Sequence, residues 1–550
     1  METFTLNTPF SRSYWVLPTV FLAGAFPGAK SQTEAQDKLE RLIDAGVRRI
    51  INLMEPGETD HYGNLFNEYE QTVLQIAEKK GLSIDCLRFP VADLNLPTVP
   101  EMGHILDAIT TGVDERKPVY VHCWGGIGRT GTVVGCYLLD NGLAHPDDVL
   151  EKIARLREGD PKNFLSSPET EPQRKFVLSW LDNATGQPTQ LSRTVGCMLG
   201  GAVGDALGAP VEFSTRNEIL RQFGPDGITA YAPAYGGLGT ITDDTQMTLF
   251  TAEGLIRGWV QGGHKDIGTY KGMVARAYLR WLQTQDERPT GTVDDQEAGW
   301  LIRQELLHSR RAPGNTCLSA LKKMTAPGEP ARNNSKGCGG VMRMAPAGLF
   351  AWKLNDHYSH QEAFRLSMDL AAITHGHPTG TLTGGVLAVM IMEIMGGATL
   401  AEAIAAAKVC LRQEVNFDET LRAIELAEEL AVSPIQHEKA IARIGQGWIA
   451  EEALAISICC ALVARNFRDG VILAVNHDGD SDSTGSITGN LLGALYGATA
   501  IPQAWLEPLE LRDVITELAV DLFAFRHWRI GQNPSNQELG RSIWQKYPGI

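Results

Sequence analysis

The sequence predicts a multidomain chain: an N-terminal α/β domain with a sheet flanked by helices, and a C-terminal all-α bundle. Three observations support this prediction. A chain of 550 residues is too long for one hydrophobic core. Strand and helix signals alternate up to residue 183, and the remainder carries almost only helical patterns. We therefore predict domains over residues 1–183 and 192–550, joined by a linker over residues 184–191.

The N-terminal elements follow one another in a regular rhythm. Residues 34–45 have the apolar spacing of a helix that ends at Gly46, and a buried strand is predicted directly after it, at Arg49–Leu53. Further strands are predicted at Ile84–Phe89 and Val119–His122, each after a helical segment. This alternation is typical of a sheet that is covered by helices.

The rhythm stops at the linker, which is polar, contains Gly and Pro and has no apolar periodicity. Beyond it, small residues are frequent in two apolar segments, 200–208 and 485–497, which lets helices approach closely. Segments rich in Ala, Leu and Glu without β-branched alternation predict helices at Glu402–Val409, Phe417–Ala431, Glu451–Ala464 and Leu509–Phe523.

The composition, 43% hydrophobic and 21% charged, is that of a soluble globular protein. A net charge of −16 disfavours non-specific binding to nucleic acid. Nine scattered cysteines without CxxC pairs predict reduced thiols and a cytoplasmic location. We expect no secretory signal in residues 1–30 and no membrane partner, because the apolar stretch Gly384–Met395 is short and interrupted by Glu393.

The first chemical centre is a predicted strand that runs into a glycine-rich loop and then an apolar helix, over residues 119–138. Gly125, Gly126 and Gly128 allow successive backbone N–H groups to form an anion nest at the helix N-terminus. The same positive environment favours the thiolate of Cys123, which is the competent nucleophile. Arg129 can hold two phosphate oxygens in a bidentate fork. This pattern predicts transfer of a phosphoryl group to sulfur and hydrolysis of the phosphocysteine by water.

The leaving oxygen needs a proton donor, and Asp93 is the best candidate because it follows a strand in a loop flanked by prolines. The whole pattern resembles the Cys-x5-Arg protein phosphatases of the tyrosine and dual-specificity class, over roughly residues 10–182. The resemblance implies Cys123 as nucleophile, Arg129 as phosphate binder and Asp93 as general acid. It also implies that Thr130 acts in the hydrolytic step and that His122 sets the loop.

Two simpler interpretations compete with an active phosphatase. One is a buried cysteine beside a turn, with Arg129 in a surface ion pair. The other is an inactive phosphatase-like module that only binds phosphate or a partner. Trp124 follows the cysteine and no lysine precedes Arg129, so a highly phosphorylated inositide is disfavoured as substrate.

The second chemical centre consists of two acid-rich clusters, residues 242–244 and 480–483. Carboxylates at such short spacing repel one another unless a cation neutralises them. Oxygen-only ligand sets suit hard divalent ions such as Mg²⁺, Mn²⁺ or Ca²⁺. The clusters therefore predict a metal site with one or two ions. Helix N-capping alone would need only one such residue in each cluster.

Other residues complete this second centre. A glycine-spaced helix ends at Gly208 and brings Glu212 just beyond it, and either Glu212 or a metal-bound carboxylate can deprotonate a water. Backbone N–H groups at Gly337, Gly339 and Gly340 can meet a diphosphate. His375 either contacts ribose or adenine, or is simply packed.

Taken together, these segments resemble the ADP-ribosylglycohydrolase family over roughly residues 192–530. The blocks that carry the resemblance are Gly204–Gly208 with Glu212, Thr242–Asp244, Asn334–Arg343, Thr374–Pro378 and Asp480–Ser483. The resemblance implies an all-α fold, two Mg²⁺ or Mn²⁺ ions and hydrolysis of the bond at C1″ of ADP-ribose. It implies six metal ligands: Thr242, Asp243, Asp244, Asp480, Asp482 and Ser483.

The leading hypothesis is thus a bifunctional hydrolase that acts on an ADP-ribosylated protein, nucleic acid or metabolite and on a phosphorylated substrate. The alternative is a single-activity ADP-ribosyl hydrolase whose phosphatase-like domain is a reader of phosphate or of a partner. A third hypothesis is a metal-stabilised scaffold without turnover.

Overall fold

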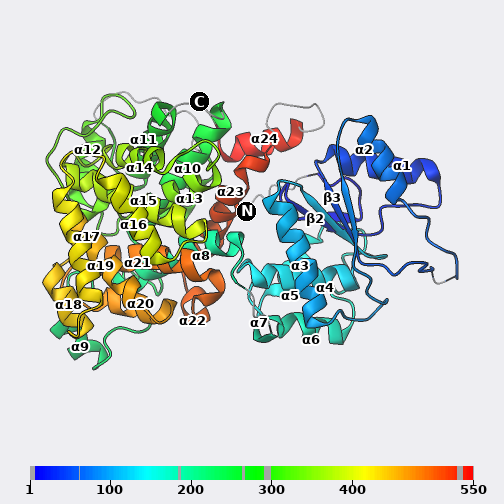
Figure 1. The fold of residues 1–550 in the computed structure, drawn as a ribbon, viewed down its shortest axis with the longest axis horizontal. Coiled ribbons are helices and arrows are strands. Elements are labelled where there is room, and N and C mark those ends of the chain that lie inside the picture. Colours follow the sequence, from blue (N-terminus) through cyan, green and yellow to red (C-terminus); the bar gives the residue numbers. More distant parts are fainter. Residues whose placement is uncertain are drawn as a thin grey trace. The chain divides into compact units, whose positions relative to one another are not determined.

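The computed structural model describes residues 7–60, 62–183, 187–262, 267–289, 299–528 and 537–548. The chain divides into two compact units, Met1–Thr189 with Arg526–Ser542 and Gln190–Phe525 with Ile543–Ile550 (Figure 1). Residues 184–186 of the predicted linker lie outside the described residues. Its last two residues, Gln190 and Leu191, are the first residues of helix α8 (Gln190–Gly208).

The first unit is a five-stranded sheet with the order β1-β2-β5-β3-β4, in which β1 and β2 are antiparallel and the other pairs are parallel. The strands are β1 (Ser13–Leu17), β2 (Phe21–Gly24), β3 (Arg49–Asn52), β4 (Asp85–Arg88) and β5 (Val119–His122). The helices are α1 (Gln32–Asp44), α2 (Glu70–Lys79), α3 (Val99–Asp114), α4 (Gly128–Asp140), α5 (Val149–Leu156), α6 (Glu171–Leu178) and α7 (Trp180–Asn183).

The predicted α/β architecture is confirmed. The three predicted strands are β3, β4 and β5, and the predicted helix at residues 34–45 is α1, which begins after the N-cap Ser31. The sequence analysis did not identify β1 and β2. They form an antiparallel pair joined by a short turn at Thr19, so no intervening helix marks them in the sequence.

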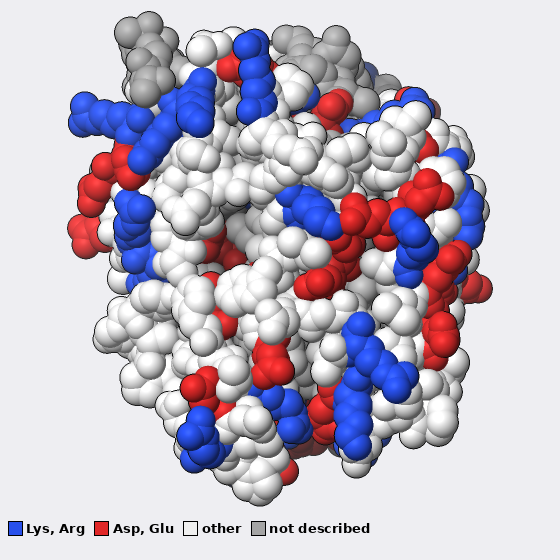
Figure 2. Space-filling view, turned by 90° about the vertical axis from the view of Figure 1, so that its left-hand side faces the viewer, with Lys and Arg blue, Asp and Glu red and all other residues white. Residues whose placement is uncertain are grey.

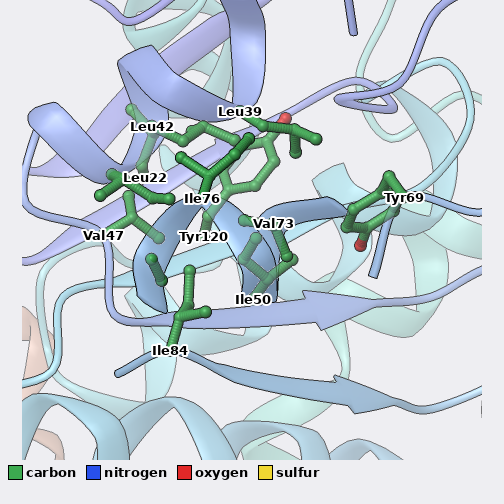
Figure 3. Packing of buried hydrophobic residues seen from close by; sticks show 12 residues of the cluster. Leu22, Leu39, Leu42, Val47, Ile50, Tyr69, Val73, Ile76, Ile84 and Tyr120 are labelled. Carbon is green, nitrogen blue, oxygen red and sulfur yellow. The ribbon is translucent and has the colours of Figure 1, made fainter. Parts of the chain in front are cut away.

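One hydrophobic cluster holds α1 and α2 against the sheet (Figure 3). Leu22, Ile50 and Tyr120 project from three neighbouring strands, and Leu42 of α1 and Val73 of α2 pack over them. These side chains are fully buried, and each contributes about 1.5–3 kcal/mol of burial free energy. This packing holds β5 in the middle of the sheet, and the glycine-rich loop begins where β5 ends.

The second unit is helical, as predicted. Its elements begin with α8 and continue with α9 (Arg216–Phe223), α10 (Asp243–Gly262), α11 (Ile267–Thr284), η1 (Leu301–Arg303), η2 (Glu305–Leu307), α12 (Asn315–Lys323), η3 (Cys338–Gly340), α13 (Ala345–Lys353), α14 (His360–Ala371), α15 (Pro378–Met395), α16 (Leu400–Leu411), α17 (Asp418–Ala431), α18 (His437–Ile444), α19 (Ala450–Val463), α20 (Phe467–Val475), α21 (Ser481–Tyr496), η4 (Ala498–Ala500), α22 (Gln503–Leu506) and α23 (Arg512–Ala524). Two further elements, η5 (Phe525–His527) and α24 (Gln537–Lys546), span the division between the units.

Four predicted helices correspond to α16, α17, α19 and α23. The last was predicted to begin at Leu509 but begins at Arg512. The reason is local: Leu511 has a φ of 57°, which is a left-handed conformation that an α-helix does not contain.

The two central helices, α8 and α21, run antiparallel with their backbones in contact. A Cβ atom at Gly204 would lie 2.0 Å from the carbonyl oxygen of Gly485, and one at Gly208 would lie 2.3 Å from that of Ser481. Similar contacts recur every four residues along the seam, at Gly196 and Gly200. Glycine is therefore required for the close approach. The approach brings the C-terminal end of α8 beside the N-terminal end of α21, where the second acid-rich cluster lies.

Helix α15 is long and apolar enough, by length and composition, to span a membrane. The sequence analysis considered only residues 384–395 and judged that stretch too short, whereas the helix has 18 residues. Within the unit, 89% of this helix is buried, which is the environment of a core helix.

Candidate active sites

The glycine-rich loop after β5 places a backbone donor at the cysteine sulfur. The N–H group of Gly126 donates to Sγ of Cys123 over 3.2 Å. Gly126 has a φ of 67°, and a Cβ atom there would lie 2.5 Å from the carbonyl carbon of Gly24. Only glycine fits this position, so the predicted anion nest rests on a real constraint of the backbone.

A residue that the sequence analysis missed braces this loop from outside. Arg12 donates through Nη2 to the carbonyl oxygen of Gly125, and its Nε lies 2.9 Å from the carboxylate of Asp160. Asp160 is buried and also faces Arg157. Because Arg12 precedes the loop by more than a hundred residues, no local pattern could reveal the contact.

Arg129 is buried beneath the loop, and a second missed residue holds it. Both terminal nitrogens donate to the carboxylate of Glu58 over 2.8 Å. Nη1 also donates to the carbonyl of Val91, and Nη2 lies 2.9 Å from Asp93. Burial alone would lower the pKa of Arg129, but these anionic neighbours raise it above its ordinary value. The buried Nε has no hydrogen-bond partner among the described residues.

Asp93, the predicted general acid, therefore lies in contact with Arg129, the predicted phosphate binder. Its side chain is 43% exposed, so it lies at the rim of the site with one oxygen on Arg129. The interpretation that Arg129 forms a surface ion pair is wrong. Arg129 does form an ion pair, with Glu58, but its guanidinium is buried.

His122 is fully buried at the end of β5. The Tyr69 hydroxyl lies 2.6 Å from its Nε2, and its Nδ1 lies 3.2 Å from the carbonyl oxygen of Cys123. Burial lowers the pKa of His122 from 6.5 to about 3, so the ring is neutral at physiological pH. Thr130 is buried beside it with its hydroxyl 3.5 Å from the Gly24 carbonyl, and Gly128 packs against Gln173.

In the helical unit, Asp205 organises the start of α10. Its carboxylate accepts hydrogen bonds from the backbone N–H and the hydroxyl of both Thr242 and Thr245. The sequence analysis quoted Asp205 as part of a motif but gave it no role. The structure shows that it fixes the cluster of residues 242–244 against α8.

The two acid-rich clusters meet, although 240 residues separate them. The hydroxyl of Thr242 lies 3.2 Å from Oδ2 of Asp482. Asp480 is the N-cap of α21 and accepts from the N–H of Ser483, so the capping interpretation holds for this one residue. Asp243 accepts from the N–H of Gly314 over 3.1 Å.

Two carboxylate oxygens of this cluster, Oδ1 of Asp244 and Oε2 of Glu212, are buried without a hydrogen-bond partner among the described residues. Burial and then the charges of neighbouring carboxylates raise the pKa of Asp205 to about 7, of Asp243 to about 8 and of Glu212 to about 11. The pKa values of Asp244 and Asp480 are raised for the same reasons, and burial raises the pKa of Asp482. The cluster is thus unfavourable as a set of anions unless positive charge enters it.

No three His, Cys, Asp or Glu side chains of the described residues already surround a common point as metal ligands would. The donor set nevertheless fits a hard divalent cation, because it combines carboxylates with the hydroxyls of Thr242 and Ser483 and leaves two buried oxygens unpaired. Proteins of the family to which this unit belongs, as shown below, are generally metal-dependent.

The loop at residues 337–343 lies beside the acid cluster. The N–H of Cys338 donates to the carbonyl of Trp448, so this group is occupied, whereas Gly339 and Gly340 border His375. His375 is 1% exposed and bonds the Thr374 hydroxyl, and burial lowers its pKa to about 3. This position suits packing beneath the loop; contact with a ligand stays a prediction.

An exposed aromatic pair that the sequence analysis missed lies next to these residues. Phe213 directly follows Glu212 and is 71% exposed, and its ring stacks on Trp448, which is 38% exposed. Figure 2 shows one face of the molecule with a hollow near its centre, Asp or Glu atoms visible inside the hollow, and mostly uncharged residues at its border.

Each unit thus contains one site, and the two differ in kind: a thiol in a backbone nest and a cluster of carboxylates where two helices meet. The corresponding class is that of hydrolases. Residues 186–530 match the family model of ADP-ribosylglycohydrolase, and the chain belongs to this family. Residues 11–173 match the model described as "Swiss Army Knife protein, DSP-PTPase phosphatase domain". Both domain families are hydrolases.

Individual proteins are similar to parts of this chain. The chain is 28% identical over 332 residues to ADP-ribosyl-[dinitrogen reductase] glycohydrolase of Rhodospirillum rubrum, covering 59% of this chain and 92% of that protein. It is 26% identical over 380 residues to ADP-ribosylarginine hydrolase Tri1 of Pseudomonas putida, covering 68% and 89%. The solved structure of Tk-PTP in its active form aligns with 32% of this chain and 98% of its own length, at 22% identity and a TM-score of 0.24.

Proposed function

We propose that this protein is a bifunctional hydrolase that cleaves the C1″ glycosidic bond of an ADP-ribosylated substrate in its helical unit and hydrolyses a phosphomonoester in its α/β unit. The observation that carries the first activity is the contact between Thr242 and Asp482, because it joins two acid clusters from distant segments into one site. The observation that carries the second is the N–H of Gly126 on the sulfur of Cys123.

In the helical unit, cleavage of the C1″ bond builds positive charge on the ribose, and the buried carboxylates lie where they can stabilise it. Glu212, with one unpaired oxygen, would in its ionised form accept a proton from the attacking water and pass it to the leaving atom as the C1″ bond breaks. Thr242, Asp243, Asp244, Asp480, Asp482 and Ser483 would hold Mg²⁺, with Mn²⁺ as the second choice. Bound ions would supply the positive charge that keeps these carboxylates ionised and would orient the ribose hydroxyls.

In the α/β unit, Sγ of Cys123 would attack phosphorus while the bond from phosphorus to the ester oxygen breaks. Asp93 would give its proton to the leaving oxygen, and water would then cleave the sulfur–phosphorus bond to release phosphate. Arg129 can contribute its unpaired Nε directly, while Glu58 keeps its terminal nitrogens in place.

Two substitutions in the full-length protein test whether both sites are active. Cys123→Ser should abolish release of phosphate from a phosphomonoester, because Cys123 is the proposed nucleophile of that reaction. The rate of ADP-ribose release from ADP-ribosylated arginine should stay within about twofold of wild type, because Cys123 takes no part in it. Asp480→Ala should reduce the second activity by about 100-fold or more and spare the first. If either single change removes both activities, or one activity is never detected, the bifunctional proposal is wrong.

Removal of divalent ions tests the metal proposal independently of activity. We expect the melting temperature of the helical unit to rise when Mg²⁺ is added to chelator-treated protein, because a ligand at about 100 times its Kd stabilises by ~2.7 kcal/mol. The Asp480→Ala variant should lose most of this response. An identical melting temperature of the wild-type protein with and without Mg²⁺ or Mn²⁺ would contradict the metal proposal.

We also propose a cytoplasmic location for the protein.

A further inference from the structure

A cavity of about 650 Å³ opens beside the cysteine loop of the α/β unit. It is distinct from the nucleophile itself, because neither Cys123 nor Arg129 lines it. It shares its wall with the loop: Trp124 follows Cys123, and the N–H of Phe26 donates to the Trp124 carbonyl over 3.0 Å. A single molecule can therefore place a phosphate on the loop and another group in the cavity.

Aromatic rings dominate this wall. The ring centroids of Phe26 and Phe66 are 5.1 Å apart, and those of Phe66 and Trp124 are 5.6 Å apart. All three rings are only half-buried, and Phe10 lines the cavity as well. Partly exposed aromatic faces that converge on one cavity favour a flat, apolar-faced ring as ligand.

The charges around the cavity are balanced, and this argues against a highly charged ligand. Lys38 is paired with Glu34 over 2.8 Å, and Lys30 with Asp60 over 3.7 Å. Arg12 is paired with Asp160, and it braces the loop as described above. An inositol polyphosphate would need unpaired cations and has no flat face to stack. Polar side chains at the cavity, among them Asn64 and Asn67, offer amide groups for the edge of a base.

A single phenyl ring, as in phosphotyrosine, is much smaller than a cavity of this size, whereas a nucleoside combines a flat base with a sugar. From these contacts we infer that the phosphatase site acts on a nucleotide-type phosphomonoester, whose phosphate lies on the Cys123 loop and whose base stacks among Phe26, Phe66 and Trp124. This inference rests on the proposed phosphatase function and specifies its substrate class.

The test compares three phosphomonoesters with the full-length protein: adenosine 5′-monophosphate, glycerol phosphate and a phosphotyrosine peptide. We expect the highest kcat/KM for the nucleotide. Phe66→Ala should lower kcat/KM for the nucleotide by about tenfold, the usual effect of losing one base-stacking ring, and leave that for glycerol phosphate within about twofold. Phe66→Tyr should keep the wild-type preference because the ring remains.

Tyr62→Ala is the matched control. Tyr62 lies in the same loop as Phe66, is 89% exposed and does not line the cavity, so its loss should change neither rate. Melting temperatures of the variants would reveal any general loss of folding. Two results would overturn the substrate assignment while leaving the phosphatase function intact. One is a higher kcat/KM for the phosphotyrosine peptide than for the nucleotide, and the other is an equal loss of kcat/KM for all three esters in Phe66→Ala.

If no ester is hydrolysed, the phosphatase proposal fails, and the cavity can still be judged by binding. Calorimetric titration of the Cys123→Ser protein with adenosine 5′-monophosphate should then show binding that weakens about tenfold in the Cys123→Ser, Phe66→Ala double variant. Binding that is absent, or that is unaffected by Phe66→Ala and therefore lies elsewhere on the chain, would overturn the inference.

Discussion

The two sites of this protein differ in the charge partners of their buried ionisable groups. In the α/β unit, the buried Arg129 already has anionic partners, Glu58 and Asp93, and the sulfur of Cys123 has a backbone donor. In the helical unit, the carboxylates that surround Asp482 have mainly one another as neighbours, and their pKa values rise. In the first site the chain itself supplies the charge partners, whereas we propose that the second takes up a cation from solution.

The difference follows from how each site is built. A loop at the end of a strand exposes several backbone N–H groups at once, so it provides positive potential without side chains. Along the contact between α8 and α21 the backbone N–H and C=O groups are paired within each helix, and at the N-terminal end of α21 the side chain of Asp480 caps the helix, so side chains provide the chemistry. The site between helices therefore consists of side-chain oxygens.

The largest expected effect concerns the seam that only the helical unit has. Gly204→Leu should prevent that unit from folding, because even a Cβ atom would lie 2.0 Å from the Gly485 carbonyl oxygen. The control is Gly272→Ala in α11, where a Cβ atom meets nothing within 4 Å. It should be neutral or stabilise by up to ~1 kcal/mol, since alanine is the better helix former. Circular dichroism and urea unfolding measure both. Normal folding of the Gly204→Leu protein would refute the backbone contact.

The next effect separates the units by pH. Burial lowers the pKa of His122 to about 3 in the folded protein, below the value near 6.5 of an exposed histidine, so the folded state loses stability as the pH falls below 6.5. Between pH 7 and pH 5 the α/β unit should lose about 2 kcal/mol from this residue alone. His122→Asn should flatten this slope in urea unfolding, and an unchanged slope would count against a neutral buried imidazole.

The helical unit should respond in the opposite direction when chelator is present. In the acid-rich site, six carboxyl groups have raised pKa values: Asp205, Glu212, Asp243, Asp244, Asp480 and Asp482. A carboxyl group whose pKa is raised in the folded state favours folding most at low pH. Its contribution to the free energy of unfolding is lost as the pH rises above about 4. The two histidines of this unit with lowered pKa, His375 and His477, oppose the trend but are fewer. Unfolding at pH 8 and pH 5 should show greater stability at pH 5, and addition of Mg²⁺ should reduce the difference.

The smallest effect concerns the brace on Arg129. Glu58→Gln keeps the shape of the side chain but removes the charge that pairs with both terminal nitrogens. We expect kcat/KM for a phosphomonoester to fall about tenfold, mainly through KM, as for other residues that orient a binding group. The ADP-ribosyl hydrolase rate of the same variant serves as control and should not change. A faster phosphatase would mean instead that Glu58 competes with the substrate for Arg129.

Several features could be predicted from the sequence because their signals are local. The glycine-rich loop places Cys123, Gly126 and Arg129 within seven positions, and the spacing alone specifies a nest followed by a helix. The helical unit is likewise evident from apolar periodicity and from glycines at every fourth position. Asp93 and Glu212 were identified because each follows a recognisable element.

Other features could be known only from the tertiary structure. Arg12, Glu58 and Phe66 lie far along the chain from the loop that they support or border, and nothing in their own neighbourhoods marks them. The role of Asp205 depends on α10 meeting α8, and the stacking of Phe213 on Trp448 joins segments more than two hundred residues apart. Short-range spacing encodes an element and the groups at its ends, whereas the partners that pair with those groups depend on which elements pack together.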